Sequence, residues 1–278
     1  MDWLTEPFGE ALMQRALLGG ILAVLTTSVV GTWVVLRGMS FIGDALAHGV
    51  LPGIALAVVW GVDVRLGALV SALVMVGGVN LVARKARLPE DTSIGLLFVG
   101  MLALGVIIIS RQRSYAGELS SLLFGEILGV TGNDLLLQLG AAAVVVVAVV
   151  VGYRAFLAVA FNADKAASLG LHPRLAHLAL LALVAVAVVA SFRAVGTLLV
   201  FGLLVAPPAT ASLLVRRVPL VMVVAVLVGT AAVVVGLLVS FHHGTAASAT
   251  VAFTAIVFFF VGLAVTQVVE RVAGRTAV

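Results

Sequence analysis

The feature that most constrains this chain is the repetition of apolar runs long enough to cross a bilayer. Two such runs, Leu135 to Val151 and Leu175 to Ala190, contain no Asp, Glu, Lys or Arg. A membrane-spanning helix needs about 20 mostly apolar residues. Only 10% of the residues are charged, against about 25% in soluble domains, so the chain lacks the polar surface that water requires. The sequence therefore predicts an all-α, polytopic helical membrane protein, formed by one domain over residues 1–278.

The connections between the runs predict how the helices cross the membrane. Basic residues concentrate in alternate connections, which the positive-inside rule assigns to the cytoplasm, although Arg111 and Arg113 run against the rule. Nine crossings would place the N-terminus outside. Eight full helices are the alternative if residues 194–213 form a broken or re-entrant element, because Pro207 and Pro208 are expected to break a helix. The predicted spans are 14–36, 45–60, 66–83, 93–110, 135–154, 175–191, 194–213, 219–240 and 248–269.

Residue types that the chain lacks disfavour several functions. Cysteine is absent, which excludes disulfides and thiolate metal sites. The two lysines, Lys85 and Lys165, follow Arg84 and Asp164 rather than a glycine, so the chain has no phosphate-binding loop. Any ATP hydrolysis would need another polypeptide, and without HExxH or GxSxG motifs the chain is not expected to be an enzyme. The net charge of +4 reflects basic loops at one membrane face rather than a nucleic-acid partner.

One pair of ionisable residues stands out at the start of an apolar run. Asp44 and His48 are four residues apart, so a helix projects both from one face. A carboxylate with a neutral imidazole suits divalent zinc or manganese. The alternative is structural: the helix dipole would favour Asp44, which would simply hydrogen-bond His48. Pro52, one turn later, is expected to kink the helix and free a carbonyl near the same face.

Five motifs in order connect the chain to a known family. The run VVLRGMSFIGDALAHGVLPGIALA resembles the permease subunits of the bacterial zinc/manganese (ABC-3) ABC importers. It is followed by LPEDTSIGLLFVGMLALGVIIIS, LLFGEILGVTGNDL, SFRAVGTLLVFGLLVAPPATASLL and GLLVSFHHGTAASATV. The resemblance extends from about residue 15 to residue 265. Within the family, LRGMSFIGDALAHGVLPG and HHGTA look most like permeases of actinobacterial zinc importers.

The resemblance implies an assembly in the bacterial cell membrane. Two permeases would form a homodimer around the metal pathway, each contacting a cytoplasmic ATPase, while an extracytoplasmic protein delivers the metal. Asp44 and His48 match the aspartate and histidine of the family and are expected to be pathway ligands. The loop FNADKAASLGLHPR is similar to the segment that couples permease to ATPase, with Ala167 and Gly170 at its core.

The predicted outer face carries further ionisable residues. Many family members have an acidic or aromatic residue where this chain has His242 and His243. These histidines could add imidazole ligands at the outer mouth, or they could be ordinary solvated loop residues. Glu126 and Asp134 could attract cations, although a helix cap is the simpler account of Asp134. Arg193 could neutralise an acidic residue or hold the binding protein.

A second set of ionisable residues is expected to serve the fold rather than the metal. Asp134 is predicted to cap a helix, and Glu90 with Asp91 is predicted to form an N-terminal capping cluster. His172 and His177 are expected to pack beside the coupling segment. These assignments leave Asp44 and His48 as the main candidate site.

Together the residues and the resemblance predict the permease subunit of an ATP-driven divalent metal importer. The favoured cargo is Zn²⁺, with Mn²⁺ possible, and ATP would bind the partner subunit. Transport would proceed by alternating access of the helices around Asp44 and His48. The alternative is a secondary, ion-coupled metal transporter, which the coupling-like loop and the lack of inverted-repeat symmetry disfavour. An intramembrane enzyme is a third class, disfavoured by the missing catalytic motifs.

Overall fold

The computed structural model describes residues 7–39, 41–110, 127–161 and 170–272. Within these ranges the chain contains helices and no strand, and nine spans are long and apolar enough to cross a membrane. The all-α, polytopic class is therefore confirmed. The elements are η1 (Pro7–Gly9), α2 (Ala11–Leu36), α3 (Phe41–Gly49), α4 (Leu51–Trp60), α5 (Val64–Ala86), α6 (Glu90–Ser110), η2 (Ile127–Gly129), α8 (Gly132–Phe161), α10 (Pro173–Val195), α11 (Thr197–Leu214), α12 (Val218–His243) and α13 (Ala247–Val272).

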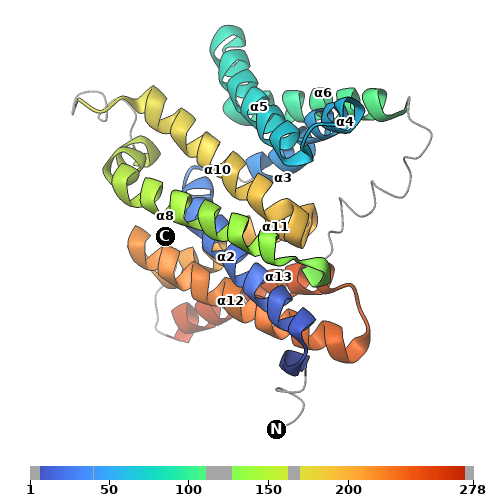
Figure 1. Cartoon of the computed structure of the whole chain (residues 1–278). Helices are drawn as coiled ribbons and strands as arrows, with labels where there is room; N and C mark the ends of the chain where they lie inside the picture. Colours follow the sequence, from blue (N-terminus) through green and yellow to red (C-terminus); the bar gives the residue numbers. More distant parts are fainter. Residues whose placement is uncertain (1–6, 40, 111–126, 162–169, 273–278) are drawn as a thin grey trace.

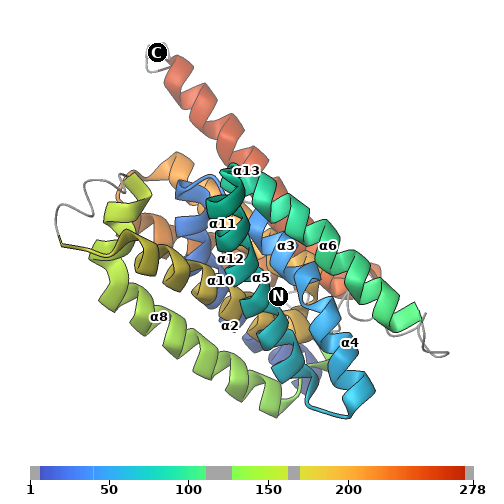
Figure 2. The same cartoon turned by 90° about the horizontal axis from the view of Figure 1, so that it is seen from above.

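The helix α2 lies at the centre of the molecule and packs against α8, α10, α11 and α12 (Figures 1 and 2). It is the most deeply buried of the spans. Its hydroxyl side chains bond within the helix: Thr27 donates to the Ala23 carbonyl at 2.6 Å, and Thr32 donates to the Ser28 carbonyl at 2.9 Å. The helix α13 packs on α11 and α12. We call α2, α8 and α10–α13 the main bundle.

The helices α3, α4, α5 and α6 form a second group, which we call the α3–α6 unit. They pack mainly on one another and stand to one side of the main bundle (Figure 1). The unit meets the main bundle where α5 packs on α10 and where α3 packs on α10 and α11. The α3–α6 unit carries the candidate metal ligands, so its contact with the main bundle bears on function.

The break predicted at Pro207 and Pro208 is wrong, because α11 continues through both prolines. A proline has no N–H, so Pro207 leaves the Leu203 carbonyl without its usual helical partner. Ser28 of α2 donates its hydroxyl to this carbonyl at 3.4 Å. A neighbouring helix thus compensates for the missing bond, which is how prolines are tolerated inside membrane helices.

The next carbonyl, that of Leu204, is also freed, and it points at Gly31 of α2. A Cβ atom at Gly31 would collide with the Leu204 carbonyl oxygen. Only glycine therefore allows α2 to approach the proline-containing turn this closely. The prolines mark a helix–helix contact rather than the end of a helix.

The interruption lies instead at Val50, between α3 and α4. Pro52 lies in the first turn of α4. Because proline has no N–H, it cannot donate the backbone hydrogen bond that would continue the helix from α3. Ser71 of α5 donates its hydroxyl to the Gly49 carbonyl at 2.7 Å and so braces the interrupted backbone. Residues 41–60 thus form one span made of two short helices.

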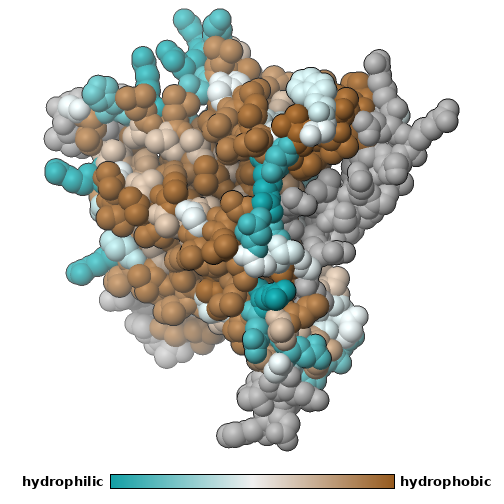
Figure 3. Space-filling model, in the orientation of Figure 1, coloured by the Kyte–Doolittle hydropathy of each residue, from teal (hydrophilic) through white to brown (hydrophobic). Residues whose placement is uncertain are grey.

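The surface is divided between an apolar belt and a basic edge. Figure 3 shows hydrophobic residues over most of the visible face, with hydrophilic side chains projecting along its upper and left edges. Successive spans alternate in direction, so every second connection lies on the same side of the bundle. The connections and helix ends on that side, which we call the basic face, carry Arg37, Arg84, Lys85, Arg87, Arg174, Arg216, Arg217 and Arg271. The positive-inside rule assigns this face to the cytoplasm.

Candidate metal site

Asp44 and His48 lie one turn apart on α3, a helix that is buried from Ile42 to Gly49 except at these two residues and exposed at Phe41. His48 Nε2 is 3.5 Å from Asp44 Oδ1. The Asp44 side chain is 40% exposed and the His48 side chain is 21% exposed, whereas Ala45, Leu46 and Ala47 between them are buried. The helix therefore presents a carboxylate and an imidazole together, on the one face that is not covered by its neighbours.

Phe98 of α6 holds the imidazole from one side. The rings of His48 and Phe98 lie 5.6 Å apart, edge to face, at an interplanar angle of 61°. Such pairs are favourable beyond the area they bury. The contact restricts the rotation of His48 and ties its position to α6.

The pair supplies two of the ligands that a metal needs. In the part of the chain that the structure describes, no group of three or more His, Asp or Glu side chains could hold a metal ion. A zinc site usually has four ligands, and manganese takes more oxygen ligands still. A metal at this edge would complete its coordination with water or with another chain.

His242 and His243 do not join this pair. They end α12 on the side of the bundle opposite the basic face, whereas α3 begins at the basic face. His242 Nδ1 lies 2.9 Å from the Leu238 carbonyl oxygen, and His243 Nδ1 lies 3.1 Å from that of Val239. Both rings can thus bond their own helix, and their role in metal capture stays a prediction.

The segment expected to contact the ATPase is described only in part. Ala167, like Glu126, lies outside the described residues, and the side chain of Arg193 is not described. Gly170 has φ 73°, in the left-handed region that favours glycine, and a Cβ there would meet nothing within 4 Å. Gly170 therefore lies in open space at the basic face, directly before α10.

A polar cluster at the basic face, which we call the Glu90 cluster, was not predicted from the sequence. It joins Arg37 at the end of α2, Glu90 at the start of α6 and His177 on α10. Arg37 Nη1 donates to His177 Nδ1 at 2.6 Å, and Arg37 Nη2 lies 3.8 Å from Glu90 Oε2. His177 Nε2 lies 3.1 Å from Glu90 Oε1, although this buried oxygen has no hydrogen bond of good geometry. The sequence assigned Glu90 to helix capping, but its carboxylate instead faces residues distant in sequence.

The Arg37 side chain lies largely buried beside the carboxylate of Glu90. Burial lowers the pKa of the Arg37 guanidinium from its ordinary value, and the negative charge of Glu90 opposes the shift. Arginine nevertheless stays protonated at any physiological pH. The Glu90 cluster thus holds a permanent positive charge, partly withdrawn from water, beside a carboxylate.

A second ion pair lies at the opposite face. Arg65 of α5 donates through Nη2 to Asp134 Oδ1 of α8 at 2.5 Å. Asp134 also accepts the backbone N–H of Thr131 at 3.1 Å, while the Thr131 hydroxyl accepts the Asp134 N–H at 3.3 Å. The reciprocal bonds form the helix cap that the sequence predicts for Asp134. The ion pair to α5 is additional.

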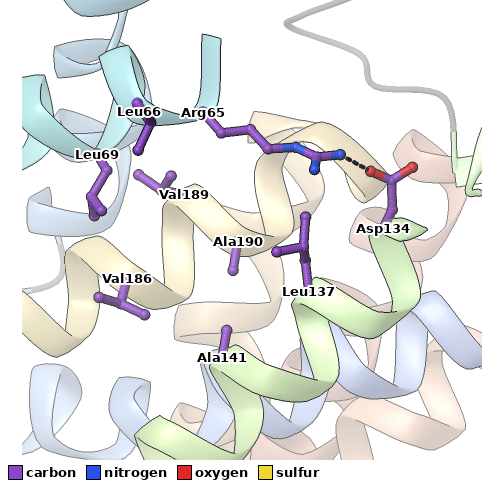
Figure 4. Close-up of a pocket in the computed structure, with 9 residues that line it drawn as sticks. All are labelled: Arg65, Leu66, Leu69, Asp134, Leu137, Ala141, Val186, Val189 and Ala190. Carbon is purple, nitrogen blue, oxygen red and sulfur yellow. Dashed lines mark hydrogen bonds and ion pairs between the residues drawn. The ribbon is translucent and has the colours of Figure 1, made fainter. Parts of the chain in front are cut away.

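A cavity of about 230 Å³ lies beside this ion pair, between α5, α8 and α10. Figure 4 shows Arg65 reaching from α5 to Asp134, with aliphatic side chains from the three helices facing the space. The lining residues are Arg65, Leu66, Leu69, Asp134, Leu137, Ala141, Val186, Val189 and Ala190. The ion pair thus borders a space whose walls are otherwise apolar.

Comparison with known proteins gives consistent results. Residues 10–266 match the ABC 3 transport family. The chain is 35% identical over 260 residues to the "Chelated iron transport system membrane protein YfeD" of Yersinia pestis, covering 94% of this chain and 87% of that protein. It is 32% identical over 251 residues to the "Manganese transport system membrane protein MntC" of Listeria monocytogenes, covering 90% and 89%.

A solved structure agrees with these relatives. The fold is similar to that described as "PsaBC from Streptococcus pneumoniae in complex with Fab", with a TM-score of 0.83, 30% identity and 94% of each chain covered. The family match runs through nearly the whole sequence, and nine apolar spans accompany it. This protein therefore belongs to the ABC 3 transport family and is a multi-pass protein of the cell membrane.

Proposed function

We propose that the chain is the permease subunit of an ATP-driven importer of divalent metal ions, with Asp44 and His48 as ligands on the metal pathway. The observation that carries the proposal is this carboxylate–imidazole pair, placed on the uncovered edge of a buried helix within a membrane-spanning bundle. Ionisable side chains at such positions are costly in lipid and usually mark an ion pathway.

The incomplete ligand set favours a homodimer. One chain supplies one carboxylate and one imidazole, and two chains related by a twofold axis would supply two of each. Four such ligands satisfy a tetrahedral metal without help from water. In this arrangement the metal lies between the two permeases, and movement of either α3 changes its coordination.

The names of the relatives bear on the cargo. They refer to manganese in MntC and to chelated iron in YfeD. A carboxylate with an imidazole accepts Mn²⁺, Fe²⁺ and Zn²⁺ alike, because none of the three requires a thiolate. We therefore propose Mn²⁺ as the first cargo to test, beside the Zn²⁺ that the sequence motifs favour.

A separate ATPase subunit would supply the energy. The chain has no lysine placed for a phosphate-binding loop. Gly170 at the basic face leaves open space directly before α10, as a contact for a partner requires. An extracytoplasmic binding protein would deliver the metal at the opposite face.

The test is Asp44→Asn in the full transporter, with its ATPase and binding protein, followed by uptake of radioactive manganese and zinc. The substitution keeps the shape of Asp44 and removes its charge, so uptake at limiting metal should fall to background. Asp91→Asn is the matched control, because Asp91 is an exposed carboxylate at the start of α6. Normal uptake by Asp44→Asn at limiting metal would overturn the site.

A further inference from the structure

We propose that the α3–α6 unit moves as one body against the main bundle during transport, held at one membrane face by the Arg65–Asp134 pair and at the other by the Glu90 cluster. We call the Arg65–Asp134 pair and the Glu90 cluster the two ties. Their side chains do not bind the metal, but they position the helices that carry its ligands. The proposal rests on the function proposed above, because the α3–α6 unit contains the candidate ligands.

Packing inside the α3–α6 unit leaves its helices little freedom to slide. A Cβ at Gly53 of α4 would collide with the Gly67 carbonyl oxygen of α5, so these two backbones touch. Gly105 of α6 also packs closely on α4, because a Cβ there would meet Leu51 Cβ at 2.9 Å. Contacts this close between helices resist relative movement, since interiors do not deform gradually. The unit is therefore expected to move as a whole.

The contact that α5 makes with the main bundle is looser than the packing inside the unit. On the side where α5 approaches α8 and α10, part of the interface is the cavity of about 230 Å³ rather than packed side chains (Figure 4). Side chains that line this open space lack protein partners on one side. Tilting α5 into this space would cost little packing, whereas tilting α5 away from α4 would break backbone contacts.

The two ties lie at opposite ends of the α3–α6 unit. Arg65 is at the start of α5 and Glu90 is at the start of α6. Because α5 and α6 are consecutive spans that cross in opposite directions, their first residues lie at opposite membrane faces. Opening one tie while the other stays closed would tilt the unit about the closed end. Alternating access requires such a movement, because the metal pathway must open to one side of the membrane while it stays closed to the other.

The Glu90 cluster also connects the ATPase side to the metal ligands. Its His177 stands on α10, seven residues after Gly170. From Glu90, α6 runs about 12 Å to Phe98, at 1.5 Å per residue, and Phe98 contacts the ring of His48. A displacement of α10 would thus reach the imidazole through two side-chain contacts and one rigid helix.

Cross-linking tests the two ties directly, because the chain has no cysteine of its own. We would combine Arg65→Cys with Asp134→Cys, and separately Glu90→Cys with His177→Cys, in the full transporter in proteoliposomes. A short, reducible bis-methanethiosulfonate would bridge each pair. Each bridge is expected to lower uptake of radioactive manganese at least tenfold, and reduction should restore the uptake of the unbridged variant.

The matched control bridges two helices inside the α3–α6 unit. Gly78 of α5 and Leu97 of α6 are in contact, since a Cβ at Gly78 would meet Leu97 Cδ1 at 2.8 Å. A bridge between Gly78→Cys and Leu97→Cys should leave uptake unchanged. Full uptake with either tie bridged would show that the tie need not open, and loss of uptake with the control bridged would show that the unit is not one body. Either result overturns the proposal.

A distance measurement keeps both ties intact and needs no metal. Nitroxide labels at Val70 on α5 and Leu136 on α8, both exposed and outside the cavity lining, report on the contact between the unit and the bundle. Labels at Val70 and Leu104 on α6 report within the unit. ATP should change the first distance and not the second. A transporter that imports metal with both distances unchanged refutes the movement alone, whereas normal uptake by Asp44→Asn refutes the site alone.

Discussion

The helices α2 and α6 both cross the membrane, but they handle polar groups in opposite ways. In α2, the most buried span, threonine hydroxyls bond to carbonyls of the same helix, as Thr27 does to Ala23. In α6, the least buried span, the ionisable Glu90 stands at the first residue and faces Arg37 and His177 of other helices. A hydroxyl satisfied within its own helix does not depend on its neighbours, whereas an ion pair between helices can exchange partners.

This difference indicates which parts of the molecule are fixed. The main bundle is built on apolar contacts and internally satisfied hydroxyls, which keep the same partners if the bundle shifts as a body. The α3–α6 unit is joined to it by charged groups at both faces, and it places Asp44 and His48 on an uncovered edge. Four variants test this contrast, from the largest expected effect to the smallest.

Gly31→Leu should prevent the main bundle from folding. Its side chain would enter the space of the Leu204 carbonyl, and the cost should exceed the ~1–3 kcal/mol of ordinary overpacking, because a backbone cannot turn aside. The measurement is the amount of monodisperse protein recovered in detergent by size-exclusion chromatography. Gly77→Leu is the control, since a Cβ there meets nothing within 4 Å. Equal recovery of both variants would show that the main bundle does not depend on the close approach of Gly31 to the Leu204 carbonyl.

Gly170→Glu should leave the protein folded and abolish transport. Bulk and charge would enter the surface at the basic face that is proposed to meet the ATPase, so metal-dependent ATP hydrolysis should be lost with uptake. Gly170→Ala is the control, because both variants share the strain of φ 73° and only one adds charge. If the glutamate variant assembles and transports like the alanine variant, Gly170 is an ordinary loop residue.

Phe98→Ala should weaken the site without removing a ligand. Loss of a ring pair worth ~0.5–1.5 kcal/mol predicts uptake that needs about two- to tenfold more metal for half-maximal rate. The variant is compared with Leu96→Ala, which shortens an exposed side chain on the same helix. An unchanged metal requirement would mean that α6 does not position His48.

Joint replacement of His242 and His243 by alanine should have the smallest effect. Both rings lie beside carbonyls of their own helix, and uptake of zinc should fall only when external zinc is scarce, by less than in Asp44→Asn. Uptake is measured over a series of zinc concentrations, and the rate at saturating zinc serves as the control. Identical curves at every concentration would leave the histidines as solvated residues at the end of α12.

Much of the fold was predictable from local pattern. The approximate bounds of the spans follow from apolar runs, because a bilayer imposes length and composition on each helix separately, whereas the choice between eight and nine full spans stayed open. The neighbouring positions of Asp44 and His48 follow from helical periodicity. Pro207 and Pro208 were misjudged, because the partner of the freed Leu203 carbonyl lies on a distant helix.

By itself the sequence determined that the chain crosses a membrane many times, that Asp44 and His48 share a helix face, and that neither lysine stands in a phosphate-binding loop motif. Only the tertiary structure decided that Glu90 faces Arg37 and His177, that an ion pair joins α5 to α8, and that four helices form a separate unit. The physical reason is the distance along the chain over which each effect acts. Hydropathy and helical periodicity act within a few residues, whereas these ties join side chains as much as 140 residues apart, and only packing brings them together.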